Sequence, residues 1–386
     1  MKTTPHHIYC ILITAAFLTL ACPPSVQAQS GTWTNKTPMP FASQDPSGAV
    51  ASNTFYAVCP AIAYAGEPSR LQAYDPASDS WTAKSPMLID CDSFAEGVAN
   101  NMIFLAGGWD GSSDHAELEA YNPTNDTWTL KTSMPSVLRA PAGGVVNGIF
   151  YVTGGAVTYP QPATLQHTVY AYHPDTDSWV TRAPMPTARA SHGVGVVNGI
   201  LYAVGGATPA GALSTVEAYD PVADAWTTKA PMPTARYALS ITVLNGLLYA
   251  VGGVDTAGNY LPTVEVYNPA TDAWATLAPM PTPRQHPALG ALGGYVFAAG
   301  GFNLASGSLR VLEVLSPPTI LGINMYAGLT VIGPVGSTNR IDYKNSFNNP
   351  NWTVLTNIVL SASPYLFIDT TSAFSSQRFY RAVPLP

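Results

Sequence analysis

Residues 191–206 read SHGVGVVNGILYAVGG, and this stretch decides the fold. Two apolar runs flank the Asn-Gly dipeptide at residues 198–199, and the second run ends at a glycine pair, residues 205–206. Asn-Gly between apolar runs is the strongest short hairpin signal, because both central residues of a type I′ turn need positive φ. The same dipeptide recurs at residues 147–148 and 245–246. The stretch therefore predicts a pair of antiparallel strands that the chain repeats.

Tryptophan recurs along the chain at spacings of 47 to 51 residues, at Trp33, Trp81, Trp128, Trp179, Trp226 and Trp274. A period of this length is typical of solenoids and propellers. A Pro-Met turn follows each of these tryptophans, and Pro interrupts strand pairing and so marks a boundary between units. A third strand at residues 216–221 and a fourth that carries Trp226 complete the unit. The pattern predicts four antiparallel strands repeated six times.

Glycine pairs mark the end of the second strand in five units: Gly107, Gly108, Gly154, Gly155, Gly205, Gly206, Gly252, Gly253, Gly300 and Gly301. Each pair in four of these units is followed by Tyr and then Trp, as in Tyr219 and Trp226. This arrangement resembles the kelch repeat of β-propellers and covers residues 33–317. We interpret these glycines and the six repeat tryptophans as structural, because glycine permits close backbone approach and the aromatic rings fill the wedge between blades.

The two ends of the repeat predict how the ring closes. The first unit has Cys59 and Pro60 where the others have Gly-Gly, so it is a degenerate blade. The sixth unit reaches a third strand at residues 311–315 and has no Trp after it, while residues 31–34 form a fourth-strand pattern with no blade before them. We expect this N-terminal strand around Trp33 to close blade six, which removes exposed sheet edges.

The chain is therefore predicted to be all-β, a six-bladed kelch-type β-propeller at residues 29–317 followed by a small antiparallel β-sandwich at residues 319–386. The second prediction rests on short alternating segments separated by Gly, Pro, Ser and Asn. The composition agrees: of 386 residues, 32 are Gly and 35 are Pro, and only 10% are charged. A net charge of -7 lacks the clustered Lys and Arg that a phosphate backbone needs, so we expect no nucleic-acid partner.

The first 28 residues have the features of an export signal. Lys2 precedes an apolar run at residues 8–21, and residues 26–28 offer a small-x-small cleavage site. A lipidated Cys22 is the less favoured alternative, because Thr19 stands where a lipobox usually has a branched apolar residue. The run is shorter than the roughly 20 residues of a membrane span, and no later segment is long enough. We predict an exported protein, secreted, periplasmic or at the cell surface, without a membrane span.

Two cysteines remain after removal of the leader, Cys59 and Cys91. An exported protein with two cysteines predicts one disulfide. Cys59 ends the second strand of blade one and Cys91 begins the first strand of blade two, so both are expected on one face of the propeller.

No hydrolase elbow, phosphate-binding loop or zinc motif occurs, and we predict no catalytic residue, metal or other cofactor. His192 and His286 share a repeat region but differ by one position in register, which opposes a metal pair.

A set of arginines follows the Pro-Met turns and marks a candidate binding site. Arg189, Arg236 and Arg284 occupy equivalent positions and Arg139 falls one residue later, while the first two units have Ser43 and Cys91 there, near Asp45, Asp90, Asp92 and Glu96. Because first strands line the propeller axis, these residues are expected at one mouth of the channel, with a basic and an acidic side. The predicted ligand-binding set is Arg139, Arg189, Arg236, Arg284, Asp92 and His286, with an acidic ligand. The alternative is that each Arg bonds backbone carbonyls and ties blades together.

Three functions are compatible with the sequence. The favoured one is an exported binding or scaffold module that recognises a glycan or a protein at one propeller face. The second is a sugar-active enzyme, since the periplasmic sialic acid mutarotases resemble this chain in having six kelch blades; a mouth with an Arg beside a buried acid would favour it, whereas exposed aromatic residues would favour binding. The third is a structural protein of the cell envelope.

Overall fold

The computed structural model describes residues 31–60, 70–158 and 163–317 and five C-terminal strands. The predicted leader, residues 1–28 with Cys22, lies outside the described residues. The described chain divides into two units, one within residues 28–319 and one within residues 320–386. In the part that the structure describes, no helix is long and apolar enough to cross a membrane.

The first unit contains six four-stranded antiparallel sheets in its described residues, which are the blades of a propeller. Blade one has β2 (Ser47–Ala51), β3 (Thr54–Cys59), β4 (Arg70–Asp75) and β5 (Ser80–Lys84); blade two has β6 (Ala95–Ala99), β7 (Met102–Ala106), β8 (Leu118–Asn122) and β9 (Thr127–Lys131); blade three has β10 (Ala142–Val146), β11 (Ile149–Thr153), β14 (Val169–His173) and β15 (Ser178–Arg182). Blade four has β16 (Gly193–Val197), β17 (Ile200–Val204), β20 (Val216–Asp220) and β21 (Ala225–Lys229); blade five has β22 (Ser240–Leu244), β23 (Leu247–Val251), β24 (Val264–Asn268) and β25 (Ala273–Thr276); blade six has β26 (Ala288–Leu292), β27 (Tyr295–Ala299), β30 (Leu312–Ser316) and β1 (Thr32–Lys36).

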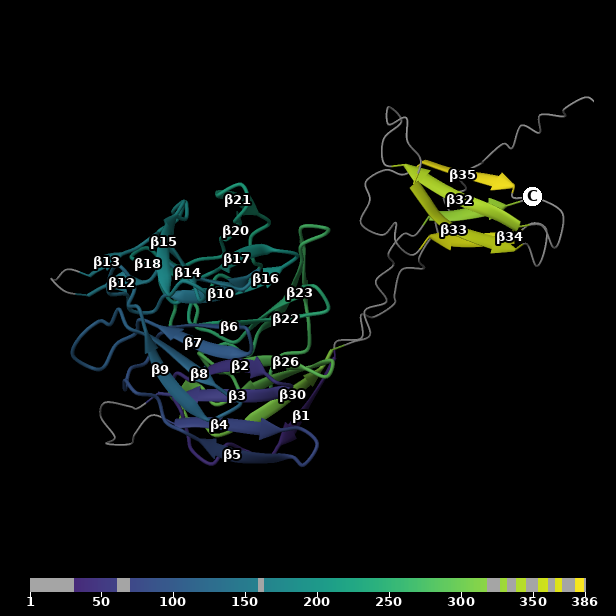
Figure 1. Cartoon of the computed structure of the whole chain (residues 1–386). Coiled ribbons are helices and arrows are strands. Elements are labelled where there is room, and N and C mark those ends of the chain that lie inside the picture. The colour runs from purple at the N-terminus through teal and green to yellow at the C-terminus, as the bar shows by residue number, and fades with distance from the viewer. Residues whose placement is uncertain are drawn as a thin grey trace, which may run out of the picture. The chain divides into compact units, whose positions relative to one another are not determined.

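The first strands of the six blades form a closed ring. β2 contacts β6 and β26, and the series continues through β10, β16 and β22. Their labels gather in the middle of the propeller in Figure 1, whereas β5 and β21 lie at its periphery. The N-terminal strand closes the ring as predicted. β1 pairs with β30, with Trp33 opposite Leu315, and so supplies the fourth strand of blade six. Blade six thus combines strands from both ends of the repeat.

The hairpin turns and glycine pairs have the backbone geometry that the sequence predicts. Asn198 and Gly199 both have positive φ, of 52° and 78°, as a type I′ turn requires. Gly205 and Gly206 have φ of 64° and 101°, and a Cβ on Gly205 would lie 2.6 Å from the carbonyl oxygen of Arg236. Both the conformation and the space exclude a side chain there.

The repeat tryptophans fix the turns that enter their blades. All six indole N–H groups donate to a carbonyl oxygen of such a turn at 2.8–3.0 Å, for example Trp226 to Ala183. In blade four, Asp224 accepts from the Tyr219 hydroxyl and from the backbone N–H of Ala183. The same Tyr-Asp pair occurs in blades one, two, three and five. Each of blades one to five is therefore tied to its neighbour by one Trp, one Tyr and one Asp, and blade six is tied by Trp33.

The predicted disulfide is wrong, because Cys59 and Cys91 are both free and buried. Cys59 lies on the face of β3 that packs with Phe55 toward blade six, whereas Cys91 packs with Tyr56 toward blade two. Alternation along β3 therefore places the two sulfurs on opposite faces of the blade-one sheet. Burial raises the pKa of the Cys59 thiol to about 11, and burial also raises the pKa of Cys91. Both thiols are protonated and unreactive at neutral pH.

Short hairpins extend three of the loops between second and third strands: β12 (Ala156–Val157) with β13 (Thr164–Leu165), β18 (Ala207–Thr208) with β19 (Gly211–Ala212), and β28 (Phe302–Asn303) with β29 (Gly307–Ser308). The second unit has β31 (Ala327–Val331) paired with β34 (Tyr365–Asp369), and β32 (Thr338–Lys344) between β33 (Thr353–Val359) and β35 (Phe379–Pro384). These are antiparallel sheets; their packing as a sandwich stays a prediction.

Candidate functional site

A belt of backbone hydrogen bonds surrounds one mouth of the channel. Ser93, Ala140, Ser191, Ala238 and His286 stand two residues before the first strand of blades two to six, and all have left-handed φ between 42° and 54°. In blades three to six, the backbone N–H of this residue donates to the carbonyl oxygen of the equivalent residue in the preceding blade, at 2.8–3.0 Å. For example, Ser191 donates to Ala140. Left-handed non-glycine residues store strain and cluster at functional sites. The belt gives the mouth a rigid rim.

The equivalent residue of blade one is Asp45, which joins the rim through its side chain. Its carboxylate lies 2.7 Å from Nδ1 of His286, in blade six. Burial by itself acts to raise the pKa of Asp45 and to lower that of His286. Their mutual attraction more than offsets this, so the pKa of Asp45 lies below 3.8 and that of His286 above 6.5. An ion pair therefore occupies the junction of the first and last blades.

Two further charged groups complete the cluster at this junction. Burial and then the Asp45 carboxylate raise the pKa of Asp92 to about 6, while Arg139 acts to lower it. The guanidinium of Arg139 lies over the ring of Trp109, 4.0 Å from the centroid. The mouth thus brings together Asp92, Arg139 and His286 from the predicted set, with Asp45 from the acidic residues beside it.

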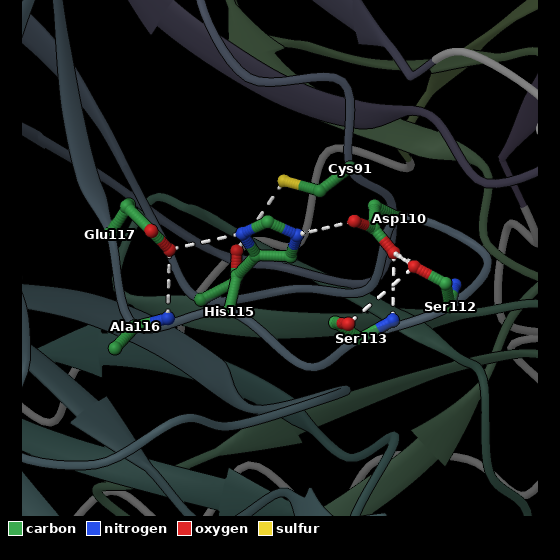
Figure 2. Close-up of polar contacts among 8 residues, drawn as sticks. Cys91, Asp110, Ser112, Ser113, His115, Ala116 and Glu117 are labelled. Carbon is green, nitrogen blue, oxygen red and sulfur yellow. Dashed lines mark hydrogen bonds and ion pairs between the residues drawn. The ribbon is translucent and has the colours of Figure 1, made fainter.

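Trp109 belongs to a loop held by a histidine between two carboxylates. Figure 2 shows the His115 ring between Asp110 and Glu117, with its nitrogens 3.1 and 3.0 Å from their carboxylate oxygens. Asp110 also accepts from the backbone N–H groups of Ser112 and Ser113 at 2.7 Å. Burial lowers the pKa of His115, but the two carboxylates outweigh it and the pKa is raised. These contacts hold the loop that presents Trp109 to Arg139.

Other aromatic side chains stand around the same mouth. Tyr237 and Tyr260 both flank Val254 through backbone bridges, and the Tyr260 ring lies 5.9 Å from that of Phe302. Burial, then Tyr237 and then Asp45 raise the pKa of Tyr260, which places these groups near the ion pair. All three aromatic residues are partly exposed.

The channel below the mouth is a cavity of about 430 Å³. Asp45, Glu96, His192 and His286 are the titratable residues among those described that line it. Glu96, on β6, accepts a hydrogen bond from the Ser47 hydroxyl of β2, and burial raises its pKa to about 7. His192 is buried, bonded to the Thr153 hydroxyl at 2.9 Å, and burial lowers its pKa to about 3, so it is neutral. The described residues contain no group of three or more His, Cys, Asp or Glu side chains that would hold a metal.

The structure buries the side chains of the other three predicted arginines, and none of the three lines the cavity. Arg189, Arg236 and Arg284 are 0% exposed. Each pairs with a buried glutamate of its own blade at 2.6–2.7 Å: Glu217, Glu265 and Glu313. Arg236 also donates to the carbonyl oxygens of Thr234 and Ala250. This geometry corrects the expectation of a basic side to the mouth, and with it the basis for an acidic ligand; the three arginines tie each inter-blade turn to the blade that follows.

Sequence reasoning missed the glutamates, although the repeat contains the signal. Each stands on the third strand of a blade that has the arginine; in blades four and five it lies two residues before the repeat Tyr. Blade two keeps the acid as Glu119 but has Cys91 in place of arginine, and burial raises the pKa of Glu119 to about 7. Comparing third strands with the turns would have shown that Arg and Glu occur together.

The Asp45–His286 pair makes a prediction about titration. In an Asp45→Asn variant, we expect the pKa of His286 to fall, because burial remains and the nearest compensating charge is lost, while the more weakly acting Asp92 stays. NMR titration of the imidazole Cε1–H signals measures both values. Glu117→Gln is the matched control, which should move the His115 titration and leave His286 in place. An unchanged His286 titration in Asp45→Asn would contradict the ion pair.

The closed ring of six four-stranded blades and its rimmed channel define a six-bladed β-propeller. Residues 141–315 match the family model described as the KLHDC2/KLHL20/DRC7 Kelch-repeats domain, and residues 97–135 match the Kelch motif. These matches show that the propeller contains kelch-repeat domains. A solved structure titled "Structure of YjhT" is similar to this chain with a TM-score of 0.61 and 17% identity, over 72% of this chain and 96% of that one. No curated protein matches the chain in sequence.

Proposed function

We propose that this protein is an exported binding module that holds a hydroxyl-rich ligand, a glycan, at the rimmed mouth of its propeller. The kelch-repeat fold supports a binding or scaffold role at the level of the family. Export is proposed from the leader features of residues 1–28.

The observation that carries the proposal is the mixed polar cluster at the entrance of the cavity. Asp45, Asp92, Arg139 and His286 supply both acceptors and donors within one small area. Asp92 Oδ1 is buried and has no hydrogen-bond partner in the described part of the chain, so it is available to a ligand or a water. Because a sugar hydroxyl both donates and accepts, a polyol satisfies such a cluster better than a ligand of a single charge type.

Aromatic rings beside the cluster supply the other half of glycan recognition. Trp109, Tyr237, Tyr260 and Phe302 are partly exposed around the mouth. Aromatic faces bury the apolar C–H surface of a ligand while nearby polar groups fix its orientation. A cavity of about 430 Å³ is within the range of small-molecule sites.

One observation favours the sugar-active enzyme as a second candidate. Asp92 has a pKa of about 6, and the positive charge of Arg139 acts on it. A carboxyl group with a pKa near the working pH suits general acid–base catalysis. Binding and catalysis would use the same mouth.

A glycan-array screen of residues 29–386 tests the proposal. We expect hits whose affinity falls about tenfold in Trp109→Ala, because the variant removes the stacking surface. The matched control is Tyr295→Ala, which removes an exposed aromatic ring from the first residue of β27, beside the β26–β27 turn at the opposite end of the channel. Anomer interconversion of the bound sugar that is fast with the protein and slow with Asp92→Asn would assign the site to the enzyme. An array without hits, or hits weakened equally by both alanine variants, would contradict the proposal.

A further inference from the structure

The wall of the cavity has one acidic group that the ion pair at the rim does not use. Glu96 lies on the first strand of blade two, near the mouth, and faces Ser47 of blade one. At the equivalent position of the other five first strands the lining residues have no polar side chain: Gly48, Gly143, Val194, Ile241 and Leu289. The hydroxyl groups of Ser240 and Thr242 also line the cavity, from β22. A carboxyl group in such a wall loses hydration, and one hydroxyl donor does not replace it.

The charges around the cavity leave Glu96 uncompensated. No Lys or Arg is among the described residues that line it. His286 is engaged by Asp45 at 2.7 Å, and His192 is neutral. Arg139 lies over Trp109 and acts on Asp92. Neither histidine therefore supplies a free positive charge to Glu96.

We propose that the ligand of this site carries a primary ammonium group, which enters the cavity and pairs with Glu96 while its hydroxyl groups contact the rim. This inference rests on the proposed function and names its ligand class as an amino sugar or another hydroxylated amine. A cation restores the interaction that the carboxylate loses on burial, whereas an anion would add repulsion. A metal ion fits less well, since the described residues offer no group of three ligating side chains.

The pairing makes binding depend on pH. Burial favours the protonated form of Glu96, whose pKa of about 7 means that it is mostly neutral at pH 6. An ammonium group favours the carboxylate, so binding should release a proton and become tighter as the pH rises from 5 to 7. Asp92 titrates in the same range and acts in the same direction, which is why the variant below is needed.

The test uses glucosamine, glucose and N-acetylglucosamine as probes of residues 29–386 by isothermal titration calorimetry. We expect glucosamine to bind at least about tenfold more tightly than the other two sugars, because a hydrogen bond between charged groups contributes a free energy of about that size. Glu96→Gln, which keeps the size of the side chain, should remove this preference, so that glucosamine binds no more tightly than glucose to the variant. In the unaltered protein, titrations at pH 6 in two buffers of different ionisation enthalpy should show proton release with glucosamine and none with glucose.

Three results would overturn the inference. Equal binding of the three sugars would show that the mouth takes hydroxyl-rich ligands without using the amine, which leaves the proposed function standing. Absence of glucosamine binding, or a preference that persists in Glu96→Gln, would reject Glu96 as the selecting group. The proposed function itself is tested separately, by the glycan array and by the comparison of Trp109→Ala with Tyr295→Ala.

Discussion

Replacing Glu265 by Gln should lower the free energy of unfolding by about 3–5 kcal/mol, because it leaves the Arg236 guanidinium buried without its counter-charge. Arg236 is 0% exposed, and Glu265 accepts from both Arg236 at 2.6 Å and the Thr234 hydroxyl at 2.7 Å. The amide that replaces the carboxylate would retain one acceptor oxygen and present an N–H₂ group to a cation. Urea unfolding followed by circular dichroism measures the loss.

The matched comparison removes both charges. Arg236→Met combined with Glu265→Met should cost less than Glu265→Gln alone, since a buried pair replaced by apolar groups of similar volume is often neutral. The affinity of a glycan-array hit should be the same in all variants, because neither residue lines the cavity. A loss of affinity without a loss of stability would restore Arg236 to the binding site and contradict the buried geometry.

Replacing Gly48 by Ala should destabilise the propeller by about 3 kcal/mol, at the upper end of what overpacking costs. Gly48 is on β2, and a Cβ there would overlap the backbone N and O of Leu289 on β26 and lie 2.7 Å from the carbonyl carbon of Ala288. These backbone atoms cannot move aside as a flexible side chain does, because β26 is hydrogen-bonded to β27 within blade six. The first strands of blades one and six would be forced apart at the ring closure. Differential scanning calorimetry measures the decrease in Tm.

The control for Gly48→Ala is Gly148→Ala. Gly148 has φ of 80° and nothing within 4 Å of an added Cβ, so the substitution costs only the left-handed backbone conformation, about 1–2 kcal/mol. Gly48 has no left-handed φ, so a loss at position 48 no larger than the loss at position 148 would contradict the close approach of β26 as the reason for this glycine.

The amino-acid sequence by itself determined the repeat unit and its number. The Asn-Gly turns, the glycine pairs and the Trp period are local signals, because each depends on backbone conformation or on spacing within one unit. The orphan strand at Trp33 was equally readable: a unit without a fourth strand and a fourth strand without a unit have one arrangement that leaves no open edge, and β1 pairs with β30 in the structure.

The tertiary structure decided the site, because its residues meet only when the ring closes. Asp45 and His286 are 241 positions apart and form the ion pair at the junction of blades one and six. The tertiary structure also decided which face of a sheet each cysteine occupies. The repeat predicts Cys59 and Cys91 on one face of the propeller in adjacent blades, but the blade-one sheet lies between the two side chains. The repeat located Arg236, but only the register of β24 brought Glu265 to it and turned a predicted ligand contact into a buried pair. Spacing along the chain reports local geometry, whereas burial and charge pairing depend on neighbours that folding alone supplies.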